Sequence, residues 1–234
     1  MKELRKITQK QLEEVLLKHK LWLEDKEGGE KADLSYCDLE GADLEYANLE
    51  NANLIGANLG YTNLEYVYLR DAYLRYANLE YDYLRYTNLE YANLENADLR
   101  DAYLRDADLK GAILKGVCLA DVIFAGVNLT YANLKGANLT GADLRSENLD
   151  YSNFENANLT GANLEYANFI GANFENANLT GANLTGANLE YVNLSGANFK
   201  NACLRYADLT YTNLENVDLE CADLEGANLE NAIF

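Results

Sequence analysis

The sequence predicts an all-β solenoid that follows a short N-terminal helix. Every fifth residue from Leu34 to Phe234 is Leu or Phe, which makes 41 positions without one slip of register. Proline is absent, and most of the 16 glycines fall at one phase of this repeat. A chain of 234 residues commonly forms one or two domains. An unbroken short repeat instead grows by stacking units on one another.

Residues 1–31 do not follow the repeat and are predicted to contain a helix. Thr8 and Gln11 have the spacing of a capping box, and Ile7 and Leu12 have the spacing of a hydrophobic staple. The apolar face of the helix is indicated by residues that recur at helical spacing, namely Leu12, Val15, Leu16, His19 and Leu23.

This helix is expected to run from about residue 8 to residues 20–24, and Gly28 and Gly29 are expected to turn the chain into the repeats. An uncovered first coil would expose leucine side chains and unpaired backbone edges to water. The apolar face, extended by Trp22, is large enough to cover that coil. The alternative is a helix that docks onto a partner. His19 lies on the apolar face and is predicted to be a packed residue.

Within each repeat the five positions have distinct residue types. If the central Leu or Phe is position i, then i−2 is mostly Ala, i−1 is mostly Asn or Asp, i+1 is usually Glu, Arg, Lys or Thr, and i+2 is mostly Tyr, Gly or Asn. Residues two apart on an extended chain point the same way, so i−2 and i point inward and i−1 and i+1 point outward. The i+2 residue suits a turn.

One such side cannot bury its leucine alone, but four sides that close into a square coil of 20 residues can. The 41 repeats then form about ten coils, and the solenoid is roughly 50 Å tall at a spacing of ~4.8 Å. Equivalent residues 20 apart should stack. Tyrosines at i+2 are predicted to form columns at Tyr46–Tyr66–Tyr86, Tyr131–Tyr151 and Tyr191–Tyr211.

The stretch ADLEYANLENANLIGANL at 42–59, with its continuation over residues 32–234, resembles the pentapeptide-repeat family. The resemblance implies a right-handed quadrilateral β-helix over residues 32–234. Residues 1–31, which do not follow the repeat, are predicted to form a separate capping helix and turn. It implies no single function. One subset of the family resembles B-form DNA in size and charge and binds DNA gyrase, which protects the enzyme from quinolones or toxins.

The repeats contain all of the net negative charge. Residues 1–31 contain eight Lys or Arg and seven Asp or Glu, whereas residues 32–234 contain 11 and 31, and the formal net charge is −19. Such charge disfavours DNA and anionic lipid as partners. No stretch of 18 uninterrupted apolar residues occurs in the sequence, so no membrane partner is expected either.

The four cysteines, Cys37, Cys118, Cys203 and Cys221, have no metal-binding spacing, and His19 is the only histidine. We therefore predict no metal site, no cofactor and no catalytic residues. Free thiols and the lack of an apolar N-terminal signal indicate a cytoplasmic protein.

Two inward positions hold carboxylates, Asp82 and Glu147. A buried carboxylate is costly unless it is hydrogen-bonded. We expect that the coil opens locally there or that the side chain reaches a neighbouring backbone amide. A catalytic role would require a cleft and a partner group, which a regular solenoid does not provide.

Several outward positions are apolar or aromatic, and they suggest an interaction patch near the middle of the solenoid. The predicted patch consists of Tyr83, Tyr103, Ile113, Cys118 and Ile123. A contiguous patch of this kind is uncommon on a monomer surface. The alternative is a side-chain ladder that stabilises one side of the solenoid by pairing between coils.

The repeat continues to Phe234 without a second capping helix. The last coils are therefore expected to expose apolar side chains and backbone edges. A second copy that meets the first about a two-fold axis would cover them. We predict a homodimer whose interface contains Leu224, Leu229, Ile233 and Phe234.

Composition and motifs favour a non-catalytic scaffold for protein interaction. The alternative is an acidic DNA mimic that binds DNA gyrase. The basic residues lie mainly between Arg70 and Arg145, interleaved with acids, and this mixed region counts against a continuous acidic surface. Because the repeat has no insertion, an uninterrupted, straight solenoid is expected.

Overall fold

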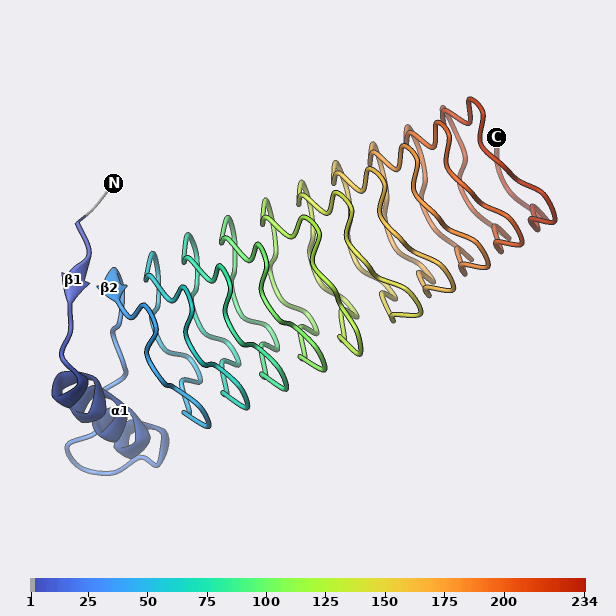
Figure 1. The fold of residues 1–234 in the computed structure, drawn as a ribbon. Coiled ribbons are helices and arrows are strands. Elements are labelled where there is room, and N and C mark those ends of the chain that lie inside the picture. Colours follow the sequence, from blue (N-terminus) through green and yellow to red (C-terminus); the bar gives the residue numbers. More distant parts are fainter. Residues whose placement is uncertain (1–2) are drawn as a thin grey trace.

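A computed structural model describes residues 3–234 as a small N-terminal unit followed by stacked coils (Figure 1). The helix and strands are β1 (Arg5–Lys6), α1 (Gln9–Leu23) and β2 (Cys37–Asp38). Parallel bridges join residues 20 positions apart, from Asp33 with Asn53 to Asn213 with Ile233. Each coil therefore contains 20 residues, as the five-residue repeat predicts for four sides.

The sides of the coils are single bridges instead of strands. In each repeat the i−1 residue is the bridged one, while i+1 and i+2 lie in a turn. Two of the five residues on each side form the corner, so too few remain to make a regular strand. Within residues 3–234 the only strands are the two-residue β1 and β2. The expected β character is thus present as ladders between coils.

Every corner has the same backbone conformation. Each i+2 residue from Tyr36 to Asn231 has a positive φ, between 54° and 75°. The next N–H closes a β-turn onto the carbonyl of residue i, as Ala42 does onto Leu39 at 2.9 Å. Positive φ at the third residue of a turn favours Gly and Asn. Many corner tyrosines stack on the ring of the next coil, as Tyr61 does on Tyr81, whereas others, such as Tyr36, lie against a corner glycine of that coil.

The predicted tyrosine columns are confirmed. Ring centroids are 5.1 Å apart for Tyr46–Tyr66, 4.9 Å for Tyr66–Tyr86, 5.2 Å for Tyr131–Tyr151 and 5.0 Å for Tyr191–Tyr211. These distances match the spacing of neighbouring coils in a β-ladder. Stacking therefore offsets part of the cost of placing a tyrosine in the left-handed region.

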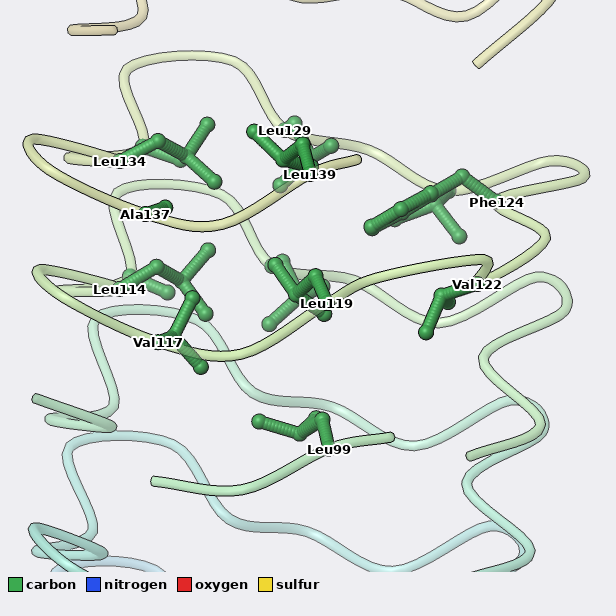
Figure 2. Close-up of a cluster of buried hydrophobic side chains, with 14 of the residues drawn as sticks. Leu99, Leu114, Val117, Leu119, Val122, Phe124, Leu129, Leu134, Ala137 and Leu139 are labelled. Carbon is green, nitrogen blue, oxygen red and sulfur yellow. The ribbon is translucent and has the colours of Figure 1, made fainter. Parts of the chain in front are cut away.

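The interior consists of the i and i−2 side chains. Figure 2 shows Leu99, Leu119 and Leu139 one above another, with Leu114 below Leu134 in a second column. These leucines are fully buried. Stacking like on like lets every coil bury its leucines against two neighbours, which a single coil in water cannot do.

Each regular repeat satisfies its own backbone N–H groups. In the repeat 177–181, the N–H groups at i−1, i and i+2 donate to carbonyls of neighbouring coils at 2.7–2.9 Å, and the i−2 N–H closes a turn. The remaining N–H, that of Thr180, donates to Oδ1 of Asn178 at 3.1 Å. Asn or Asp at i−1 thus accepts a hydrogen bond from the backbone of its own repeat, in addition to facing outward.

The N-terminal helix is confirmed with its capping box. The side-chain oxygen of Thr8 accepts from the N–H of Gln11, and Oε1 of Gln11 accepts from the N–H of Thr8 at 2.9 Å. Leu12 and His19 are buried on the face that meets the first coil. Nδ1 of His19 accepts from the N–H of Ala32 at 3.1 Å, and burial lowers the pKa of the imidazole.

The strand β1 was not predicted from the sequence. It pairs in parallel with β2, and the N–H of Arg5 donates to the carbonyl of Tyr36 at 2.7 Å. The guanidinium of Arg5 also donates to the carbonyls of Asp33 and Ser35 at 3.2 Å and 3.1 Å. Two residues are too short to show a periodic pattern. They nevertheless extend the ladder by one step below the first coil.

The corner conformation can be tested at Gly181, where an added Cβ would meet no atom within 4 Å. Any cost of substitution is therefore conformational. Gly181→Val should destabilise the protein by about 1–2 kcal/mol, because a β-branched residue is strained at positive φ, whereas Gly181→Asn should be nearly neutral. Urea unfolding of the two variants measures the difference. Equal stability of both variants would contradict the corner geometry.

Candidate functional site

The predicted patch residues lie on three sides of the solenoid. Tyr83 and Tyr103 are bridged, with ring centroids 5.2 Å apart and planes 7° apart, and Ile123 is the next residue of the same column. Ile113 and Cys118 belong to two other columns, where they are bridged to residues of those columns. Only Tyr83, Tyr103 and Ile123 therefore share a side, which we call the patch side. They are 47%, 53% and 63% exposed.

The ladder between coils is interrupted on the patch side. No bridge joins Tyr103 to Ile123 within residues 3–234, although Ile123 is bridged to Asp143 on its other flank. Across the same described range, five hydrogen bonds that the repeat forms elsewhere are absent: Asp101 N to Ala120 O, Leu104 N to Ile123 O, Ile123 N to Ala102 O, Gly126 N to Arg145 O, and Asn148 N to Val127 O.

All five interruptions involve residues 120–127, which we call the open segment. The sequence continues through it without an insertion, as predicted. The continuity of the ladder, which the unbroken register led us to expect, is lost here.

The cause is the volume of the inward side chains. Val122 precedes Phe124 at i−2, whereas the other buried phenylalanines follow smaller residues: Phe154 follows Ser152, Phe169 follows Ala167, Phe174 follows Ala172, and Phe199 follows Ala197. Extra methyl groups in a close-packed interior force the backbone to shift. The turn bond from Val122 N to Leu119 O is correspondingly long, at 3.4 Å.

Glu147 compensates for part of the interruption. Its Oε1 accepts from the N–H of Gly126 at 3.0 Å, in place of the carbonyl of Arg145. Burial raises the pKa of this carboxyl, while the backbone N–H groups of Gly126 and Val127 oppose the rise. Both expectations for this residue, a local opening and a bond to a backbone amide, are confirmed.

Asp82 is the second inward carboxyl and is fully buried. Its Oδ1 accepts from the N–H of Thr62 at 2.8 Å, as expected, while Oδ2 has no hydrogen-bond partner. Burial raises the pKa of Asp82 to about 8, although the bond from Thr62 opposes this. The group is therefore mostly protonated at neutral pH. Its carbonyl accepts from Tyr103 N at 2.9 Å, so Asp82 lies directly below the interruption.

A groove of about 540 Å³ lies beside the open segment on the patch side. Tyr103, Ile123 and Ala125 contribute apolar surface to it, and Arg85 and Arg105 line it as well. A second hollow of about 380 Å³ lies on the other flank of Ile123 and Ala125 and reaches Glu147. Neither hollow was predicted from the sequence, although the pairing of Val122 with Phe124 was visible there.

No three His, Cys, Asp or Glu side chains of residues 3–234 come together in a group that could hold a metal ion. All four cysteines are free thiols. Over the same residues, no helix has the length and apolar character needed to cross a bilayer.

Comparison with known families gives one match. A family model of pentapeptide repeats matches in eight copies, over residues 32–65, 52–81, 83–116, 114–146, 148–176, 167–205 and 202–234. The residues of 32–234 that the matches leave out are Asp82 and Glu147, the two inward carboxylates. A search of curated proteins found no match.

Among solved structures, the chain is similar to three pentapeptide-repeat or resistance proteins. HetL, involved in heterocyst differentiation regulation in the cyanobacterium Nostoc sp. strain PCC 7120, is 32% identical over 97% of this chain and 94% of its own, with a TM-score of 0.36. Rfr23 from the cyanobacterium Cyanothece 51142 is 34% identical over 54% and 90%, with a TM-score of 0.19. QnrB1, a plasmid-mediated fluoroquinolone resistance protein, is 18% identical over 80% and 84% in a trypsin-treated form, with a TM-score of 0.45.

The raised pKa of Asp82 predicts a pH-dependent stability. The carboxyl titrates near 8 when folded and near 3.8 when exposed, so its contribution is complete below about pH 4 and is lost as the pH rises through 8. The free energy of unfolding of the unaltered protein should therefore fall by on the order of 4–6 kcal/mol between these pH limits, and Asp82→Asn should abolish this fall. Urea unfolding at pH 5, 7 and 9 measures this. If the slope with pH persists in Asp82→Asn, another group is responsible.

Proposed function

The chain belongs to the pentapeptide-repeat family, and from this we propose that it is a non-catalytic scaffold that binds a protein partner through its patch side. Proteins of this family are generally non-enzymatic, and their fold is a right-handed β-helix. The finer description is part of the proposal: about ten coils over residues 32–234, capped by residues 1–31. Because the cysteines of residues 3–234 are free thiols, the proposal places the protein in the cytoplasm.

The observation that supports the proposal is the exposed column of Tyr83, Tyr103 and Ile123. Elsewhere the i−1 position is mostly Asn or Asp engaged with the backbone. Pairing between coils accounts for Tyr83 and Tyr103, which stack. It does not account for Ile123, which has no bridge to Tyr103 and is 63% exposed. An exposed apolar column beside a groove is typical of an interaction site.

The proposal is tested by affinity capture from the lysate of the source organism. A Tyr83→Asn/Tyr103→Asn/Ile123→Asn variant should lose the partner that the unaltered protein retains. The matched control is Tyr73→Asn/Ile113→Asn, which makes the same type of change in a column whose ladder is closed. If the fold and every captured partner survive the triple substitution, the patch is not the binding site.

The homodimer is a second part of the proposal. Ile233 and Phe234, in the coil of residues 215–234, are 62% and 75% exposed. Leu224 and Leu229 are half-buried in the same coil. A second copy that meets this surface about a two-fold axis would cover the apolar side chains and the backbone edge together.

Light scattering tests the dimer. The unaltered protein should be dimeric at high micromolar concentration, and Leu229→Glu/Ile233→Glu should be monomeric because two charges would be buried in the interface. A strict monomer at that concentration overturns the proposal.

The alternative is a DNA mimic that binds DNA gyrase, and the net charge of −19 is the observation in its favour. Ion pairs in the middle coils reduce that charge locally, since Arg70 pairs with Glu90 at 3.3 Å and Arg75 with Glu95 at 3.1 Å. A gyrase supercoiling assay with and without the protein distinguishes the two functions. Unchanged supercoiling at micromolar protein would leave the scaffold as the supported function.

A further inference from the structure

The interruption of the ladder indicates what kind of partner the patch side binds. We propose that the groove beside the open segment binds an extended peptide segment of a protein, through main-chain hydrogen bonds and one acidic side chain. This inference rests on the proposed scaffold function and specifies the chemistry of its partner.

The first support is a line of backbone groups without partners. Six groups on the facing coils have no hydrogen-bond partner within residues 3–234: the N–H groups of Asp101, Leu104 and Ile123, and the carbonyls of Ala102, Ala120 and Ile123. Backbone N–H and C=O groups are strong hydrogen-bonding groups and are almost always paired in a folded protein, with protein or with water. Donors and acceptors that lie together on one side are what the main chain of a bound peptide can satisfy. An isolated anion would satisfy the donors alone.

The second support is the access to these groups. The i+1 residue of the preceding side is Ala120 and that of the patch side in the same coil is Ala125, at positions that are Glu, Arg, Lys or Thr in most repeats. No long side chain from these two positions therefore covers the exposed backbone. The groove of about 540 Å³ lies over it, with Tyr103 and Ile123 as apolar surface for a side chain of the peptide.

The third support is the charge of the groove. Arg85 and Arg105 are equivalent residues of adjacent coils, and both line it. Arg85 forms a long ion pair with Glu65, at 3.8 Å, and Arg105 pairs with its sequence neighbour Asp106, at 3.5 Å. Two guanidinium groups side by side favour a carboxylate between them.

The preferred peptide is therefore extended and alternates apolar residues with an acidic one. Its apolar side chains would contact Tyr103 and Ile123, and its carboxylate would lie between Arg85 and Arg105. The exposed carboxylates of Asp101 and Asp121, which also line the groove, disfavour a second acidic residue at the opposite edge.

The test begins with selection of random heptapeptides, displayed on phage, against the immobilised full-length protein. Selected peptides are then synthesised with a fluorophore and titrated by fluorescence polarisation. We expect a consensus of alternating apolar residues with one Asp or Glu. Arg85→Gln/Arg105→Gln should weaken binding at least tenfold and remove the preference for the acidic residue.

Two further variants separate the groove from the rest of the surface. Val122→Ala/Phe124→Leu reduces the interior volume without altering any surface side chain, so it should close the ladder and weaken binding at least tenfold. Tyr73→Asn/Ile113→Asn should bind the peptides like the unaltered protein. If no peptide is enriched, or if the selected peptides bind all variants equally, the inference is overturned.

Amide hydrogen exchange gives an independent measurement. The N–H groups of Leu104 and Ile123 should exchange rapidly in the free protein, in contrast to the N–H of Leu84, which donates to the carbonyl of Tyr103. Saturating peptide should slow both at least tenfold. Slow exchange in the free protein would show a closed ladder and overturn the inference. A lysate partner that binds normally while no peptide does would leave the scaffold function standing and remove only the peptide groove.

Discussion

The fold depends on one side-chain hydrogen bond, from the N–H at i+1 to the Asn or Asp oxygen at i−1. Four of the five N–H groups of a repeat have backbone acceptors, in the adjacent coils or in the turn, and the fifth has only this side chain. Where i−1 is aromatic, as at Tyr83 and Tyr103, the N–H groups of the following Arg85 and Arg105 have no hydrogen-bond partner among the described residues. Each apolar outward residue therefore costs the repeat one backbone hydrogen bond, so its presence calls for an explanation other than backbone stability.

Much of the molecule follows from the five-residue period. The register of the coils, the inward and outward positions and the tyrosine columns depend on spacing alone, and the structure has them as predicted. The helix α1 was predictable because its capping box lies within four residues. The strand β1 was not, because its pairing with β2 is specified by contacts across 32 positions of sequence and not by any local pattern.

The candidate site was predicted in part. Spacing placed Tyr83, Tyr103 and Ile123 in one column and Ile113 and Cys118 at the same position of the two preceding sides, and the structure has them there. The groove was missed because it results from interior volume. Each of Val122 and Phe124 is an acceptable core residue alone, and only their sum exceeds what adjacent coils accommodate. An interpretation that assigns residues one position at a time does not detect an excess in the combined volume of two side chains.

The departures from the repeat, scattered along the sequence, converge in space. Asp82 lies on the coil below the interruption, where its backbone carbonyl accepts from the N–H of Tyr103. Glu147 lies on the coil above it, where its carboxylate accepts from the N–H of Gly126. Between them lies the open segment. A carboxyl that cannot ionise freely and a ladder that does not close both lower stability, and a regular repeat at these positions would avoid both. Asp82 and the interruption lie on the side that also presents Ile123, and Glu147 lies on the next side. This clustering is hard to account for by stability, and it favours a functional role for the patch side.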